Sequence, residues 1–269
     1  MDIIINPNVE RLMGEIKNLK ERLLELIEER DELLFQICPN IEAEYMGLLG
    51  ALEYEALELE EKIRELKRKI EIIREKIAKQ EPVILHEIEA QIEEEYKKYA
   101  ENLLSFKNDL NEASARLNSE KLSSEHTKEL KKIYHKIAKQ LHPDLNENLT
   151  DDQKQLFFKA AEAYKTGDLT LMRMLDVVTE GVDVSAEIPK ENAVENLEKR
   201  RDKIRLDVDM MKELIRNIKG SYPYKYKEII EDKQKVCEMQ EKLRNIIGTY
   251  KAVYEEYEKE YLDFFPENA

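Results

Sequence analysis

Apolar side chains recur at steps of three and four residues over most of this chain, which is the spacing of one face of an α-helix. The pattern predicts five long helices, at residues 9–37, 41–79, 83–117, 190–219 and 225–264. Their apolar positions follow heptad seams with Glu and Lys on the flanks, which is typical of coiled coils. A single charged residue, Arg30, interrupts the seam of the first helix.

Two short breaks divide these helices into pairs. Cys38-Pro39-Asn40 separates the first two helices, and Gly220–Tyr224 separates the last two. Short connections favour antiparallel neighbours. We therefore expect an all-α chain of long antiparallel coiled-coil helices, with helical hairpins at residues 1–82 and 190–269. Between them we expect a coiled-coil helix at 83–118, a small helical unit at 119–180 and a linker at 181–189.

Two glycines lie inside the second predicted helix, at Gly47 and Gly50. Each glycine costs roughly 1 kcal/mol in a helix interior, so a compensating reason is expected. Either another helix approaches closely near the tip of the hairpin, or a partner docks at this place. The sequence leaves both interpretations open.

The segment from residue 128 to 175 differs from the rest because the sign of its charge is inverted. At about 100° per residue, residues 128–141 place apolar side chains on one arc and basic side chains on the opposite arc. The apolar arc holds Leu130, Ile133, Tyr134, Ile137, Ala138 and Leu141, and the basic arc holds Lys128, Lys131, Lys132, His135, Lys136 and Lys139. These residues include five lysines, whereas the whole chain has a net charge of −15.

The tripeptide His142-Pro143-Asp144 is expected to end this basic helix. The residue before a proline is disfavoured in the α region, and Pro143 itself fixes φ and lacks a donor. A second amphipathic helix is predicted at 151–165, capped by Thr150 or Asp151. Its apolar residues recur at spacings of three and four and would pack on the apolar arc of the first; they are Phe157, Ala160, Ala161 and Tyr164.

This arrangement resembles the J-domain family, the co-chaperones of DnaK-type heat-shock chaperones. Residues 130–134 look like the start of the family's helix II, His142-Pro143-Asp144 is similar to its signature loop, and Phe157 and residues 162–164 look like its helix III. The resemblance implies that the loop stimulates ATP hydrolysis by the chaperone and catalyses nothing itself. It also implies that Asp144 pairs with an arginine of the chaperone and that Pro143 makes the loop rigid.

The resemblance further implies a set of side chains that line the contact with the chaperone. Besides His142, Pro143 and Asp144, these are Lys131, Tyr134, His135, Lys136, Lys139 and Asn146. The family's usual helix I signature is missing upstream, so residues 103–117 are expected to take the place of that helix. The coiled-coil arms would select the client or partner complex. A second interpretation is a coiled-coil scaffold or adaptor whose J-like unit is inactive toward chaperones.

Composition narrows the remaining function classes. A net charge of −15 and a pI near 5.0 argue against general nucleic-acid binding. The chain contains no stretch of 18 apolar residues and begins without the pattern of a signal peptide, so we expect no membrane association and a cytoplasmic location. Cys38 and Cys237 stand alone, and no phosphate loop or nucleophile pair is present, so we expect no enzyme, cofactor or metal site. The seams could also pair across a homodimer.

Overall fold

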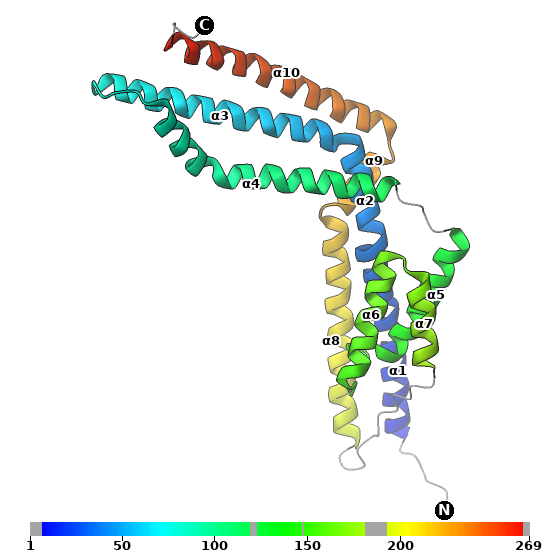
Figure 1. Ribbon diagram of the computed structural model, residues 1–269. Coiled ribbons are helices and arrows are strands. Elements are labelled where there is room, and N and C mark those ends of the chain that lie inside the picture. The colour runs from blue at the N-terminus through cyan, green and yellow to red at the C-terminus, as the bar shows by residue number, and fades with distance from the viewer. Residues whose placement is uncertain (1–6, 119–122, 147, 181–192, 266–269) are drawn as a thin grey trace, which may run out of the picture. The chain divides into compact units, whose positions relative to one another are not determined.

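The computed structural model describes residues 7–118, 123–146, 148–180 and 193–265, and all regular elements in these ranges are helices (Figure 1). The α-helices are α1 (Pro7–Glu32), α2 (Cys38–Tyr45), α3 (Ala51–Ala78), α4 (Leu85–Asn118), α5 (Ser124–Leu141), α6 (Asp151–Thr166), α7 (Leu169–Thr179), α8 (Ala193–Gly220), α9 (Lys227–Ile230) and α10 (Lys233–Asp263). Two π-helical segments, η1 (Leu33–Ile37) and η2 (Met46–Gly50), and a short 3₁₀ segment, η3 (Tyr224–Tyr226), complete the set. The all-α expectation is confirmed for these residues. The predicted linker at 181–189 lies outside them.

The chain divides into two compact units. The first unit comprises residues 1–39 and 120–225, and the second comprises residues 40–119 and 226–269. Each of them combines segments that are far apart in the sequence. The small unit predicted at 119–180 is therefore one part of a larger body.

The first unit is built on two long helices, α1 and α8, which lie side by side, and α5, α6 and α7 pack with them around one core (Figure 1). The predicted apolar arc of α5 is buried in that core, and Ile137, Ala138 and Leu141 have no exposed surface. Caps fix the ends of these helices. Thr150 forms a capping box with Gln153 at the start of α6, and Gly167, at φ 75°, ends it. The apolar pattern thus closes a core that three successive short helices share.

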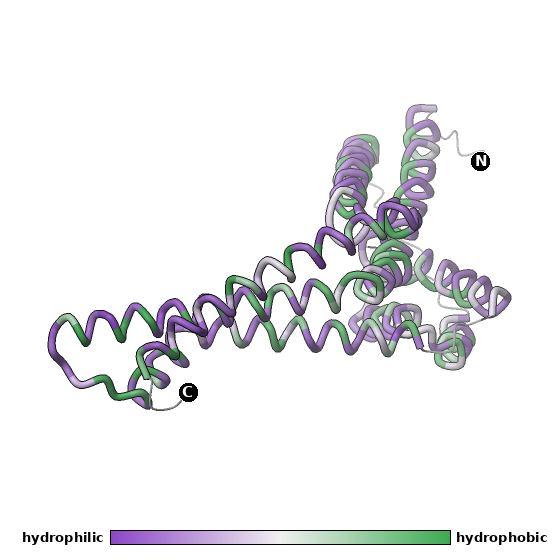
Figure 2. The backbone as a smooth tube through the Cα atoms, turned by 90° about the horizontal axis from the view of Figure 1, so that it is seen from above, coloured by the Kyte–Doolittle hydropathy of each residue, from purple (hydrophilic) through white to green (hydrophobic). Residues whose placement is uncertain are grey.

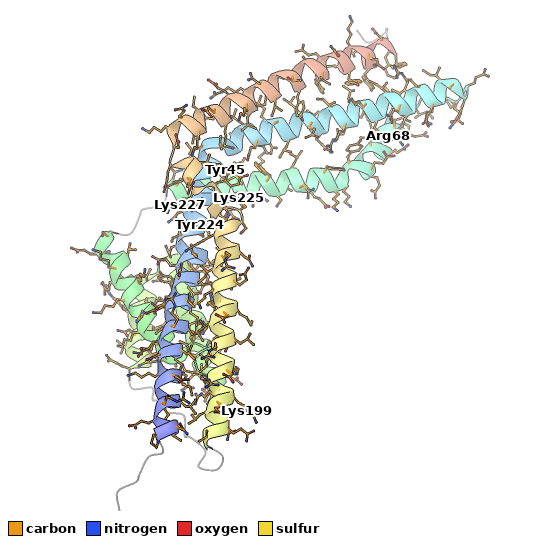
Figure 3. All side chains as sticks on the ribbon, turned by 180° about the vertical axis from the view of Figure 1, so that it is seen from behind. Tyr45, Arg68, Lys199, Tyr224, Lys225 and Lys227 are labelled. Carbon is orange, nitrogen blue, oxygen red and sulfur yellow. The ribbon has the colours of Figure 1, made fainter. Side chains whose placement is uncertain are left out.

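The second unit places α3 beside both α10 and α4. Hydrophilic and hydrophobic residues alternate along each of these helices, so each buries one stripe (Figure 2). Arg68 on α3 reaches across to α4, where its Nε donates to Oε2 of Glu95 at 2.9 Å (Figure 3). A Cβ at Gly47 would lie 2.7 Å from Leu117, and one at Gly50 would lie 2.5 Å from Leu110. The two glycines therefore allow α4 to pack closely on η2.

The helix pairing differs from the two hairpins expected at 1–82 and 190–269. In the first unit α1 packs with α8, and in the second α3 packs with α10 and α4. Helical structure also continues through Pro39, where a break was expected. A proline removes one backbone donor and crowds the carbonyl four residues earlier, and the π-helical turn of η1, directly before Cys38, offers the wider geometry that accommodates such a residue.

Candidate partner-binding site

The loop after α5 is held by backbone hydrogen bonds and by two hydrogen bonds from side chains. His142 leaves the helical region at φ −69° and ψ 126°, as the following proline requires. The carbonyl of His142 accepts hydrogen bonds from the amides of Leu145 and Asn146, both at 3.1 Å. The side-chain amide of Asn146 donates to the carbonyl of Gln140 at 2.8 Å, and Lys20 Nζ donates to the carbonyl of Leu145 at 3.1 Å. Residues 142–146, which we call the corner, therefore form a fixed turn.

The imidazole of His142 is buried inside the first unit, with only 3% of the residue exposed. Its ring meets Phe157 edge-on at a centroid distance of 4.7 Å. Nδ1 accepts from the amide of Asp144 at 3.0 Å, while Nε2 lies 3.3 Å from Nη2 of Arg30. Both ring nitrogens thus face donors, although a neutral imidazole has only one acceptor nitrogen. Protonation would leave two donors facing two donors.

The pKa of His142 is accordingly lowered from 6.5 to about 4. Burial is the main cause because it removes water from the charged form, and the guanidinium of Arg30 acts in the same direction. The carboxylates of Asp144 and Asp31 oppose this shift. His142 therefore serves the corner as a neutral, buried anchor.

Asp144 is the exposed member of the tripeptide, with 51% of its side chain accessible. Its Oδ2 lies 3.9 Å from Nη1 of Arg30 and 3.8 Å from Nδ1 of His142. Pro143 is half-buried. The structure thus presents a carboxylate at the tip of the turn, beside an arginine of α1.

Three carboxylates of α1 meet the basic arc of α5 or its border. Glu32 pairs with Nζ of Lys131 at 2.7 Å, and Glu28 contacts Nδ1 of His135. The hydroxyl of Tyr134 donates to Oδ2 of Asp31 at 2.5 Å. One edge of the predicted chaperone-binding face is therefore engaged within the chain itself.

The contact between Tyr134 and Asp31 is deeply buried, with Asp31 at 1% exposure. Asp31 also accepts from Nε of Arg30 at 2.7 Å, so its charge is paired. Burial, followed by the nearby charge of Asp31, raises the pKa of Tyr134 well above its usual value. Tyr134 further stacks on Tyr164 at 4.4 Å with an interplanar angle of 6°. These contacts place Tyr134 in the core and not on an open surface.

The remaining residues that were predicted to contact the chaperone lie in two different surroundings. Lys136 turns to α7, where its Nζ pairs with Asp176 at 2.7 Å and with Glu180 at 3.4 Å. Lys139 is exposed and lines a cavity that Asn146 also lines. The structure therefore gathers Lys139, Asn146 and the tripeptide around the corner, whereas Lys131, Tyr134, His135 and Lys136 are held by α1 or α7.

Residues 103–117, expected to replace helix I, belong to the second unit. In the first unit α1 packs on α5 and contributes apolar side chains to the same core. The sequence predicted the helix itself, at 9–37, but not its place beside α5, and so it missed the roles of Glu28, Arg30, Asp31 and Glu32. The interruption of the apolar seam at Arg30 was the one available signal, because a charged residue at a seam position needs a polar partner.

No group of acidic, histidine and cysteine side chains in the described ranges has the arrangement of a metal site. None of the helices that the structure describes could cross a membrane. Comparisons of the chain with protein-family models, with curated proteins and with solved structures found no match.

Proposed function

We propose that this chain is a J-domain co-chaperone, which recruits a DnaK-type chaperone and stimulates its ATPase through His142-Pro143-Asp144. The observation that carries the proposal is the fixed turn between two helices that pack on each other, with the carboxylate of Asp144 half exposed at its tip. Besides the J-like unit, the long helical pairs supply coiled-coil arms that select the client or partner complex. The chain itself carries out no catalysis.

Each part of the corner has a distinct role in this proposal. The buried ring of His142 and the side chain of Asn146 hold the turn, and Asp144 offers a carboxylate to an arginine of the chaperone. In the free chain Arg30 lies at that carboxylate, so the chaperone's arginine would replace or join it. Exposed ion pairs contribute only about 0–1 kcal/mol each, so the lysines chiefly attract and orient the acidic partner.

A second function, a scaffold or adaptor with an inactive J-like unit, is favoured by a specific observation. Glu32 and Glu28 of α1 already engage Lys131 and His135, and His142 is buried. In this case the corner serves packing alone, and the helical pairs bring other proteins together. The two functions differ in whether the corner acts on an ATPase.

Single-turnover ATP hydrolysis by a DnaK-type chaperone distinguishes them. We expect the full chain to stimulate hydrolysis, Asp144→Asn to abolish the stimulation, and Asp152→Asn to leave it unchanged. Asp152 is a matched control because it is an exposed aspartate of α6 that lies outside the corner. Circular dichroism would establish that both variants fold like the parent.

The double variant Glu28→Gln/Glu32→Gln extends the test, because it frees Lys131 and His135 from their partners on α1. Within the co-chaperone proposal its stimulation equals or exceeds that of the parent. If neither the parent nor this variant stimulates hydrolysis, the co-chaperone proposal is excluded and the scaffold remains. Stimulation that survives Asp144→Asn would exclude the proposed role of the corner.

A further inference from the structure

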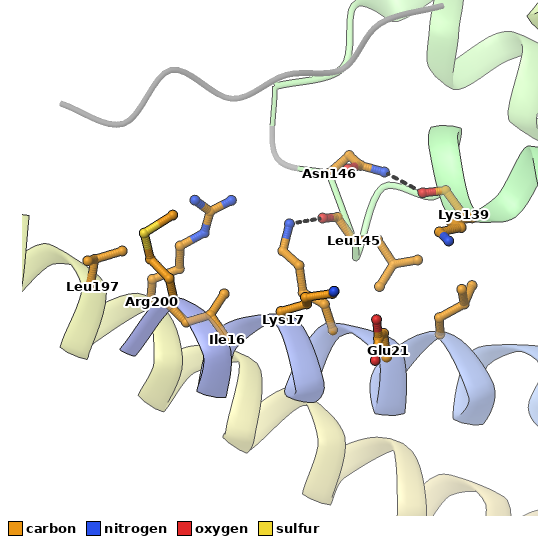
Figure 4. A pocket seen from close by; sticks show the side chains of 11 residues that line it. Ile16, Lys17, Glu21, Lys139, Leu145, Asn146, Leu197 and Arg200 are labelled. Atoms are coloured by element: carbon orange, nitrogen blue, oxygen red, sulfur yellow. Dashed lines mark hydrogen bonds between the residues drawn. The ribbon is translucent and has the colours of Figure 1, made fainter. Parts of the chain in front are cut away.

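A cavity of about 430 Å³ lies in the first unit, bordered by α1, by the end of α5 and the loop after it, and by α8 (Figure 4). Its apolar lining consists of largely buried aliphatic side chains together with the half-exposed Met13; the buried ones are Ile16, Leu24, Leu145 and Leu197. This volume falls in the range of about 300–1,000 Å³ that is usual for ligand sites. The cavity can therefore receive a side chain or a short segment of another molecule.

The border of this cavity is strongly basic. Lys17 and Lys20 of α1, Lys139 of α5 and Arg200 of α8 line it, against a single carboxylate, Glu21. On α8, by contrast, Lys219 is neutralised by Glu29 at 2.6 Å. Around the cavity, Lys17, Lys139 and Arg200 have no ion-pair partner within the described ranges. Four cations against one carboxylate therefore give the cavity an excess of positive charge, in a chain whose net charge is −15.

The positions of these cations indicate what kind of anion fits. They come from three helices and surround an aliphatic floor, so they suit several carboxylates that are spaced along a chain better than they suit one compact phosphate. A lipid would need room for long acyl chains, which a cavity of about 430 Å³ does not offer. A short peptide with an apolar side chain between acidic residues satisfies both the floor and the border.

We propose that this cavity binds an acidic peptide segment of a partner protein. An apolar side chain of the segment packs on Leu145 and Leu197, and its carboxylates pair with Lys17, Lys139 and Arg200. The site shares Lys139 and Asn146 with the proposed chaperone contact, but its test uses no chaperone, so either proposal can fail without the other. Because Leu145 and Asn146 directly follow Asp144, a bound segment would lie beside the corner and against the loop that Lys20 holds.

The test is fluorescence anisotropy with the full chain and a labelled hexapeptide of alternating glutamate and leucine. The same peptide with glutamine in place of glutamate is the chemical control. We expect the acidic peptide to bind, the neutral one to bind at least about tenfold more weakly, and affinity to fall as salt rises from about 50 to about 300 mM.

Three variants locate the binding in the cavity. Lys17→Gln/Arg200→Gln should weaken binding about tenfold or more, and Glu21→Gln should strengthen it severalfold because it removes the opposing charge. Lys159→Gln/Lys165→Gln removes two exposed lysines of α6 outside the cavity and should change nothing. The opposite signs of the first two effects cannot both arise from misfolding.

Three results would overturn the proposal. They are the absence of binding, equal binding of the glutamine peptide, and binding that neither Lys17→Gln/Arg200→Gln nor Glu21→Gln changes. Binding of the chain to vesicles that contain phosphatidylserine is measured as well. Their binding, in place of the peptide, would assign the basic border to a membrane surface and so exclude the peptide site.

Discussion

The two units of this chain bury different kinds of surface. Among the described residues, the first has one continuous core of 28 buried residues, whereas the second has clusters of four and three beside further buried side chains such as Leu49, Ile63 and Ile70. The first unit also buries Asp31 and His142 almost completely, each with polar partners. In the second, the most buried charged residue is Glu61, at 9% exposure, among the residues that the structure describes.

This difference separates a body that can hold a precise site from a set of long helices. A buried aspartate or histidine is tolerated only where its partners are placed correctly, since an unpaired buried charge is costly. The corner at His142 and the basic cavity both lie in the unit that has such partners.

The largest expected effect is the loss of stability when a fully buried isoleucine is truncated. Ile137 in the first unit and Ile73 in the second are both fully buried. Ile137→Ala should destabilise the first unit by about 3–5 kcal/mol, because the surrounding helices cannot collapse into the cavity. Ile73→Ala should cost the second unit less, about 2–3 kcal/mol, since its small cluster can close more easily.

Hydrogen exchange followed by mass spectrometry reads each unit separately, through peptides from α5 and from α3. This matters because a chain of two units need not unfold in one step. Equal losses of protection at the two sites would mean that the continuous core of the first unit gives no additional rigidity.

The next largest effect is a dependence of the first unit's stability on pH. The pKa of His142 is about 4 in the folded chain, against 6.5 as its ordinary value. The unfolded chain therefore binds more protons between these values, so stability present above pH 6.5 is lost as the pH falls toward 4. From pH 7 to pH 5 the first unit should lose about 2 kcal/mol through this residue.

Urea unfolding at several pH values, compared with His142→Gln, isolates this contribution. Asp31, Asp144 and Arg30 are present in both proteins, so the difference between the two reports on His142. His135 is present in both as well. A parent whose stability falls no more steeply than that of His142→Gln would show that the ring is not held neutral.

Local features of the first unit could be predicted from the sequence. Pro143 places the end of α5 at Leu141, Thr150 caps α6, and the apolar arc of α5 is the face that is buried. Each of these follows from the backbone restriction of proline, from the unsatisfied amides at a helix start, or from the helical period. Such features need information from only a few neighbouring residues.

The pairing of helices could not be predicted in the same way. Every seam presents similar Leu and Ile residues, so the period identifies the buried face but not the helix that covers it. The choice of α8 as partner of α1, and of α1 as partner of α5, depends on the whole fold. The same applies to the network of Arg30, Asp31 and Tyr134, in which Tyr134 is 103 residues from its acceptor Asp31.

The smallest expected effect is the loss of stability when a tyrosine hydroxyl is removed from each unit. Tyr134 donates to the buried carboxylate of Asp31 at 2.5 Å, whereas Tyr96 donates to the exposed carbonyl of Arg64 at 3.2 Å. Tyr134→Phe should cost about 2 kcal/mol, because hydrogen bonds to charged groups are stronger and a buried acceptor loses a partner. Tyr96→Phe should cost less than about 1 kcal/mol, since water can replace the hydroxyl. Hydrogen exchange of peptides from α5 and from α4 measures the two costs separately. A cost for Tyr134→Phe no larger than that for Tyr96→Phe would show that the network does not stabilise the first unit, because Arg30 alone would then suffice for Asp31.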